Sequence, residues 1–293
     1  MSSVAAAHEA AYARAMPDSL LRHVAASRNA VLPGGRLPFR LGPNRVGWLT
    51  PDLAERVVAG GARRDGAAVV LDDPAALPRL ARRLADAGAL RWRDEAFDVR
   101  ATPDGPALAQ LDRGAVPCFG VLSQGAHLNG LVRRAGETWL WVSRRAADRL
   151  MDPGKLDHLA AGGVTAGHTP DETLRKEAGE EAGLPAELLR DARRAATLAY
   201  VTERPEGLRR DVLHCYDVDL PESFTPRAVD GETESFELWP LRQVLDRVRR
   251  TDDFKFNVNL VLIDLLLREG LVNPAGPEGG RLRAALNAPV SEA

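Results

Sequence analysis

Two hydrophobic periods alternate along the first hundred residues. Apolar positions three and four residues apart predict amphipathic helices at residues 17–30, 51–61 and 74–88. Between them, short apolar or alternating runs predict strands at residues 39–50, 67–73 and 90–101, and a Gly-Pro-Asn turn divides the first of these. Helices and strands in this order predict a small α/β unit, with His23 on a helix surface.

Strand-like runs dominate after residue 118. Three of them predict a meander with turns at 124–125 and 134–137, and they lie at residues 118–124, 126–134 and 138–145. Alternation along the third run places Trp139 and Trp141 on one face. The pattern then predicts a helix at 185–195 and a long hairpin at 196–221. A strand with a helix follows at 225–248, and a strongly apolar helix at 252–271.

Residues 102–117 are rich in turn-forming residues and indicate where the chain divides. Prolines and glycines recur there between two regions with regular patterns. We therefore predict an N-terminal α/β domain over residues 1–110, a second domain over residues 111–272 and a poorly ordered C-terminal tail over residues 273–293.

Composition narrows the class of protein. Of 293 residues, 45% are hydrophobic and 27% are charged, and the net charge is −2. We therefore expect a globular protein that binds neither nucleic acid nor a membrane. No run approaches the roughly 18 apolar residues of a membrane helix, and residues 1–19 lack the apolar core of a signal peptide. The two cysteines, Cys118 and Cys215, predict reduced, buried thiols in a cytoplasmic protein.

Lysine is rare, because nearly every basic residue is arginine. The lysines are Lys155, Lys176 and Lys255. A compact ammonium binds differently from a planar guanidinium, so these positions are candidates for a specific use of lysine. Chance accounts for so small a number equally well.

Residues 159–184, LAAGGVTAGHTPDETLRKEAGEEAGL, combine a glycine loop with a short helix. Thr169 and Glu172 have the spacing of a capping box at the start of the helix, and Gly183 suits its end. Glycines in the loop allow backbone to approach a ligand closely, and they are Gly162, Gly163 and Gly167.

Three carboxylates share one face of this helix. Glu180 and Glu181 follow Glu177 by three and four residues. The three side chains therefore lie on one face and repel one another unless a cation lies between them. Hard oxygen ligands suit Mg²⁺, or Mn²⁺. A solvated acidic face is the alternative for the helix taken alone, and the glycine loop favours the metal site.

The stretch resembles the Nudix box, whose pattern is G-x5-E-x7-R-E-U-x-E-E-x-G-U with U an aliphatic residue. Two positions depart from the pattern: His168 replaces its first glutamate and Lys176 replaces its arginine. The matching positions are Gly162, Glu177, Ala178, Glu180, Glu181, Gly183 and Leu184. In the family the last three glutamates bind divalent metal and help to activate water.

The flanking residues sharpen this resemblance to one subgroup. The segments PGKLDHLAAGG, DGETESFELWP and DFKFNVNLVLIDLLLREG are similar to a Nudix subgroup with an N-terminal domain of unknown function, related to the Nudix domain of yeast thiamine pyrophosphokinase. Members of this subgroup commonly lack the first glutamate and can carry lysine for arginine. The resemblance implies an α+β Nudix fold, a mixed sheet sandwiched between helices.

The activity that the resemblance implies is metal-dependent cleavage of a diphosphate linkage in a small-molecule substrate. Thiamine diphosphate and its oxidised analogues are the implied substrates. The alternative is a nucleoside diphosphate linked to a sugar or another nucleoside. An alternative of another class is a module that binds diphosphate ligands with little turnover. A homodimer is left open.

The resemblance also implies roles for single residues. Glu177, Glu180 and Glu181 are the expected metal ligands, and Lys176 is expected to orient Glu177. Either one of these glutamates or a later carboxylate takes a proton from water, with Glu232 or Glu234 favoured over Asp230. Backbone contacts with the substrate are expected from Gly162 and Gly163. Independently of the resemblance, Arg144, Arg145 and Trp141 are candidates for side-chain contacts, with solvated arginines and sheet packing as the alternatives. Trp48 and Phe119 are further aromatic candidates, and His168 is expected to be an exposed helix-start residue, with a phosphate contact as the alternative.

The N-terminal unit carries no recognisable chemistry of its own. We expect it to lie over one side of the active cleft, because junctions between domains are common ligand sites. Selectivity would then come from this unit or from loops such as residues 203–210.

Overall fold

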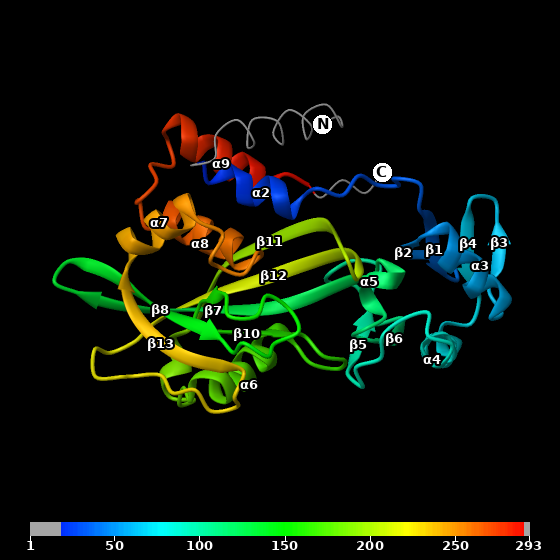
Figure 1. Cartoon of the computed structure of the whole chain (residues 1–293), viewed down its shortest axis with the longest axis horizontal. Coiled ribbons are helices and arrows are strands. Elements are labelled where there is room, and N and C mark those ends of the chain that lie inside the picture. The colour runs from blue at the N-terminus through cyan, green and yellow to red at the C-terminus, as the bar shows by residue number, and fades with distance from the viewer. Residues whose placement is uncertain (1–18, 290–293) are drawn as a thin grey trace.

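The computed structural model describes residues 19–289, in which a seven-stranded sheet has a smaller four-stranded sheet beside it (Figure 1). The small sheet has the strand order β2-β1-β4-β3. Helices α3 and α4 share a core with this sheet, so the α/β prediction for this part is confirmed. Its elements are β1 (Leu37–Leu41), β2 (Asn44–Leu49), α3 (Pro51–Ala59), β3 (Arg63–Asp65), β4 (Ala68–Leu71), the 3₁₀ helix η1 (Pro74–Ala76) and α4 (Leu77–Asp86).

A two-stranded ribbon and a one-turn helix connect the two sheets. They are β5 (Ala96–Val99), β6 (Ala109–Asp112) and α5 (Val116–Phe119). The strand predicted over 90–101 is confined to β5. Arg93 and Glu95 instead donate their amides to the buried Asp112 carboxylate, at 2.9 Å and 3.1 Å.

The large sheet is mixed, as predicted. Its strand order is β11-β12-β7-β8-β13, with β10 beside β7 and β9 beside β8. The central pair, β7 and β12, is parallel, and the other pairs are antiparallel. The strands are β7 (Leu122–Arg134), β8 (Glu137–Arg145), β9 (Leu156–Asp157), β10 (Ala160–Gly163), β11 (Arg193–Arg204), β12 (Gly207–Asp219) and β13 (Thr233–Pro240).

Helices cover both faces of the large sheet (Figure 1). On one face α6 (Pro170–Ala182) buries Leu174 and Ala178 in a core with Leu128 and Trp141. On the other face four helices share a larger core with the sheet, and they are α2 (Leu21–Ser27), α7 (Leu241–Arg250), α8 (Val258–Arg268) and α9 (Pro277–Asn287). The predicted sandwich of helices around a mixed sheet is confirmed.

Two predicted local elements are wrong because long-range pairing overrides the local pattern. The turn expected at 124–125 lies inside β7, which pairs with β12 without interruption from Leu122 to Leu131. The helix expected over 185–195 is only the 3₁₀ helix η2 (Leu188–Asp191), and β11 starts at Arg193 to pair with β12. In both places the hydrogen bonds of the sheet determine the conformation.

The two ends of the described chain meet on one face of the large sheet. Helix α2, predicted over 17–30, lies against α9, where Arg28 donates to the carbonyls of Leu286 (2.7 Å) and Ala288 (2.9 Å). Residues 273–289 are therefore not a poorly ordered tail. His23 is buried rather than on the surface, because its Nε2 faces the Val248 carbonyl at 2.7 Å. Residues 1–18 and 290–293 lie outside the described residues. They include nearly all of the N-terminal segment for which the sequence predicts no signal peptide.

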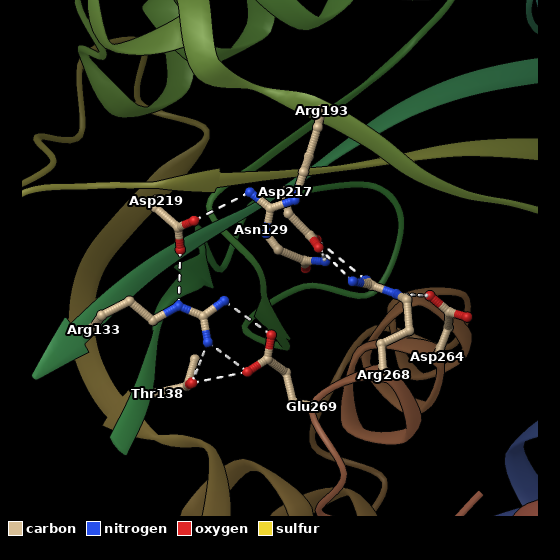
Figure 2. A network of polar contacts seen from close by, with 9 residues as sticks. All are labelled: Asn129, Arg133, Thr138, Arg193, Asp217, Asp219, Asp264, Arg268 and Glu269. Carbon is tan, nitrogen blue, oxygen red and sulfur yellow. Dashed lines mark hydrogen bonds and ion pairs between the residues drawn. The ribbon is translucent and has the colours of Figure 1, made fainter. Parts of the chain in front are cut away.

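A network of paired charges fastens α8 to the sheet (Figure 2). Asp217 on β12 is fully buried and accepts hydrogen bonds from Asn129 (2.9 Å) and Arg268 (3.2 Å). Arg268 also contacts Asp264 at 2.7 Å. The other half of the network joins Arg133 to Asp219 (2.9 Å) and Glu269 (2.9 Å).

Candidate active site

Helix α6 begins and ends as the sequence predicts. Thr169 Oγ1 accepts a hydrogen bond from Glu172 N at 3.2 Å, and the Glu172 carboxylate accepts one from Thr169 N at 2.8 Å. Gly183 closes the helix with φ of 61°, a left-handed conformation that glycine adopts without strain. These local contacts fix which side chains of α6 face the sheet.

Glu181 is the buried carboxylate of this helix, with 8% of its surface exposed. It accepts a hydrogen bond from the amide of Ala161 on β10 at 2.8 Å. Burial raises the pKa of Glu181 to about 8, and the negative charges of Asp157 and Glu177 act in the same direction. A buried carboxylate surrounded by other carboxylates is a position where a cation is favoured.

Lys176 lies between Glu177 and Glu180, the other two glutamates of the acidic face. Its Nζ is 3.2 Å from Glu177 and 2.9 Å from Glu180. Burial raises the pKa of Glu177, while Lys176 acts against that shift. Gly162 lies against Glu177, since a Cβ at Gly162 would be 2.2 Å from the Glu177 side chain. A side chain at residue 162 would therefore displace the Glu177 carboxylate.

A loop before β13 brings two further carboxylates to Glu181. Ligand oxygens of Glu181, Asp230 and Glu232 all lie within 4.8 Å of one another. Glu232 also forms an ion pair with Arg149. Glu234, the other candidate for a later carboxylate, is exposed on β13 and is not part of this group. The group offers hard oxygen donors, so its chemistry fits Mg²⁺ or Mn²⁺.

A cavity of about 530 Å³ lies next to these carboxylates. The amide of Ala161 joins the two, because Ala161 lines the cavity and donates to Glu181. Gly162 and Gly163, the glycines expected to allow close backbone approach, form part of the wall. Among the described residues, six cationic side chains line the cavity against three carboxylates. The cations are Arg91, Arg93, Arg113, Arg204, Arg209 and Lys255.

The family model for the NUDIX domain matches residues 126–259, which include the glycine loop, α6 and the loop that carries Asp230 and Glu232. Over these residues, just under half of the chain, the sequence is similar to the Nudix hydrolase family. Residues 19–125 form an extension on the N-terminal side of the Nudix domain.

Curated relatives match beyond the Nudix domain. Nudix hydrolase 24, chloroplastic, of Arabidopsis thaliana is 41% identical over 185 residues, which cover 63% of this chain and 51% of the relative. Nudix hydrolase 20, chloroplastic, of the same plant is 40% identical over 182 residues, covering 62% and 49%. The uncharacterized protein YJR142W of Saccharomyces cerevisiae is 30% identical over 201 residues, covering 64% and 58%. The chain thus spans about half the length of the plant relatives it matches.

These relatives correct the predicted location. Both plant proteins are named as chloroplastic, so the prediction of a cytoplasmic protein is wrong. It rested on two free cysteines, and reduced thiols do not distinguish the cytoplasm from other reducing compartments. Within residues 19–289, no helix is both long and apolar enough to cross a bilayer.

Three side chains predicted to contact substrate lie away from the cavity of the Nudix domain. Arg144 donates to the Gly154 carbonyl at 3.0 Å, and Arg145 contacts Asp157 at 3.2 Å. Trp141 is 8% exposed and lies in the core under α6. The side chains of Trp48 and Phe119 are buried in other cores. None of these five residues is part of the cavity wall in the described chain.

One further site prediction concerns His168, and one cavity residue was not predicted. His168 is exposed at the start of α6, where its Nδ1 lies 3.1 Å from Thr165 Oγ1. This position agrees with the expectation of an exposed helix-start residue. The aromatic side chain that does reach the cavity is Phe97 of β5, and it also packs against Gly163.

Sequence reasoning missed a buried polar row behind the cavity. His127 of β7 faces His158, with 3.0 Å between Nδ1 and Nε2, and His158 in turn faces Asp157 at 3.1 Å. Lys255 completes the row at 3.7 Å from Asp157. His127 and Lys255 both line the cavity. The rarity of lysine had marked Lys255, but nothing local in the sequence indicates that the histidines meet.

Proposed function

We propose that this protein is a divalent-metal-dependent hydrolase that cleaves a diphosphate linkage in a small-molecule substrate. The observation that carries the proposal is the group formed by Glu181, Asp230 and Glu232, whose ligand oxygens lie within 4.8 Å of one another beside the glycine loop. The adjoining cavity, with its excess of cationic side chains, supports a polyanionic ligand. Similarity to the Nudix family supports the same reaction type.

Residues of two elements would share the chemistry. Glu181 of α6 would hold Mg²⁺ with Asp230 and Glu232, and Glu177 and Glu180 remain candidate ligands on the same helix face. Bound Mg²⁺ would offset phosphate charge and lower the pKa of a coordinated water. Glu232 is our candidate for the group that takes the proton from water, because it lies beside Glu181, whereas Glu234 does not.

Lys176 has a positioning role in this proposal. Its ammonium contacts both Glu177 and Glu180, and these contacts raise the pKa of Lys176 to about 12, with the hydrogen bond to Glu180 as the largest cause. Lys176 therefore stays charged and holds the two carboxylates in place. Gly162 and Gly163 would let their backbone approach the diphosphate.

The charge of the cavity bears on the leaving group. Thiamine diphosphate carries a cationic thiazolium ring, which the excess of arginine would disfavour, while its oxidised analogues lack that charge. The aromatic side chains first expected to stack on such a ring, Trp141, Trp48 and Phe119, are absent from the described cavity wall. The lining therefore favours the alternative, a nucleoside diphosphate linked to a sugar or another nucleoside, over thiamine diphosphate itself.

A substrate screen tests the proposal. Full-length protein is assayed with Mg²⁺ against ADP-ribose, dinucleotides, thiamine diphosphate and oxidised thiamine diphosphate, and phosphate-bearing products are quantified. We expect metal-dependent turnover that is abolished by chelator. Ligand-induced thermal stabilisation without turnover on any compound would instead favour the binding module. The domain boundary near residue 110 and the homodimer stay predictions, and size-exclusion chromatography with light scattering tests the latter.

A further inference from the structure

The N-terminal wall of the cavity holds two exposed arginines that contact no carboxylate of the described chain. Within residues 19–289, Arg91 and Arg93 have no ion-pair partner. Every other cation of the wall has one: Arg113 contacts Glu95 (2.8 Å), Arg204 contacts Asp152 (3.7 Å), Arg209 contacts Asp211 (2.8 Å) and Lys255 contacts Asp157 (3.7 Å). The three carboxylates of the wall, Asp152, Glu206 and Asp211, are thus already engaged by arginine.

These two arginines are held in place by the fold rather than carried on a loose loop. The buried carboxylate of Asp112 accepts hydrogen bonds from the amides of Arg93 (2.9 Å), Glu95 (3.1 Å) and Gly114 (2.8 Å). Trp92, between the arginines, packs against the N-terminal core, with Arg82 5.0 Å above its ring. Asp112 and Trp92 therefore fix the backbone from which Arg91 and Arg93 reach the cavity.

The two arginines also repel their neighbours. Burial and the nearby charges of Arg113 and Arg91 lower the pKa of Arg93, and the charge of Glu95 offsets only part of this shift. Like charges gathered in a cavity are unfavourable unless a ligand offsets them, and guanidinium groups bind phosphate or carboxylate through paired hydrogen bonds. Glu181, Asp230 and Glu232 are not part of the cavity wall, and none of them forms an ion pair with Arg91 or Arg93.

We infer that Arg91 and Arg93 form a second anion-binding site, which takes a phosphate or carboxylate on the part of the substrate beyond the diphosphate that is cleaved. This inference rests on the proposed function for the identity of the bound molecule as a substrate. It makes the preferred substrate a diphosphate compound with an additional anionic group. It also gives the N-terminal extension a direct part in selecting the substrate.

The first experiment measures binding alone, so it does not depend on turnover. Inorganic phosphate is titrated calorimetrically into full-length protein in chelator at constant ionic strength. We compare wild type with the double variant Arg91→Ala/Arg93→Ala and with Arg79→Ala/Arg190→Ala, which removes two exposed arginines outside the cavity. We expect the cavity variant to bind at least tenfold more weakly, because charge-assisted hydrogen bonds are lost, and the control variant to match wild type.

Two results would overturn the inference: no detectable phosphate binding by wild type, or equal binding by all three proteins. A parallel titration with malonate distinguishes a phosphate site from a carboxylate site. The anion that wild type binds more tightly, and that the cavity variant no longer binds, identifies the chemical group that the site takes. The variants should keep the melting temperature of wild type, since no ion pair is removed. Arg93→Gln, which removes the charge but keeps a polar side chain, replaces the double variant if folding fails.

The second experiment links the site to the reaction. KM and kcat are measured for ADP-ribose and for its 2′-phosphate derivative, which differ only by one phosphate. We expect wild type to have the lower KM for the phosphorylated compound, and the cavity variant to lose this preference with kcat unchanged. The same preference in both proteins would contradict the inference. Absence of turnover on every compound, with phosphate binding intact, would contradict the proposed function and leave the anion site standing.

Discussion

The charged groups of this protein are arranged in two different ways. In the network of Figure 2, described arginines and carboxylates of the sheet and α8 are matched, and the most buried carboxylate, Asp217, has two donors. Around the cavity, where other charges are also paired, two groups gather charges of one sign. Glu181, Asp230 and Glu232 form one group, and Arg91 and Arg93 form another. Glu232 is the member that also has a partner, Arg149.

The pKa values reflect this difference. In the network, burial acts to raise the pKa of Asp219, yet hydrogen bonds from Arg133 and Arg193 bring it below its ordinary value. Near the cavity, burial and neighbouring carboxylates raise the pKa of Glu181. The network therefore stabilises charge within the protein itself, whereas the cavity groups need charge from outside.

This comparison distinguishes residues that serve stability from residues that serve a ligand. A matched buried pair contributes to the folded state only while both partners are present. An unmatched group lowers stability slightly and is retained where it binds something. Substitutions in the two regions should therefore have opposite effects on stability and on turnover.

The largest effect is expected from Arg268→Ala in the network. Loss of this guanidinium leaves Asp217 buried with only Asn129 as a donor, and we expect the free energy of unfolding to fall by about 3 kcal/mol or more. Turnover per folded molecule should be unchanged. Urea unfolding measures the first and an active-fraction assay the second. Arg242→Ala, which breaks an exposed pair with Glu137, should cost less than about 1 kcal/mol; equal costs would remove the distinction.

Glu181→Gln should show the reverse behaviour. The substitution keeps size and removes one ligand charge, so we expect turnover to fall about a hundredfold or more, since metal supplies several kcal/mol of transition-state stabilisation. In chelator, stability should hold or rise. Steady-state kinetics with Mg²⁺ measures the loss. Glu232→Gln should also lower turnover and Glu234→Gln should not, while full activity of Glu181→Gln would exclude it as a metal ligand.

Lys176→Met should lower turnover about tenfold, the lower end of what groups that orient metal ligands contribute. Its side chain is 51% exposed, so its ion pairs should add little to stability. Arg175→Met, the exposed neighbour on α6, is the matched control and should leave both quantities unchanged. A fall in melting temperature with normal turnover per folded molecule would make Lys176 a structural residue.

The smallest effect concerns pH in the metal-free protein. Glu181 has an ordinary pKa of 4.5, raised to about 8 in the folded state. Between these values the folded protein holds a proton that the unfolded chain has released, so stability should decrease as pH rises. In chelator we expect the melting temperature to fall by a few degrees between about pH 5 and pH 8. The profile of Glu181→Gln should be flatter, and Mg²⁺ should restore more stability at pH 8 than at pH 6. Parallel profiles for wild type and variant would contradict the assignment.

The sequence by itself determined those features that depend on contacts within a few residues. The bounds of α6 follow from Thr169, Glu172 and Gly183, because a capping box spans three positions and a left-handed helix end needs one glycine. Local spacing also places Glu177 and Glu181 on one face of α6, and it determines which side chains of β8 lie on the same face of the sheet. The Nudix pattern itself is local, so the fold it implies could also be predicted.

Only the tertiary structure decided which distant residues meet. Glu232 reaches Glu181 through the loop before β13, and the pairing of β7 with β12 overrides the turn expected at 124–125. Arg91 and Arg93, on irregular backbone fixed by Asp112, become part of a cavity lined mainly by the Nudix domain. Periodicity reports which face a residue lies on, but not what is opposite that face. The counter-charge of each group therefore depends on how the two sheets and their loops pack together, and this packing distinguishes the matched network from the unmatched cavity.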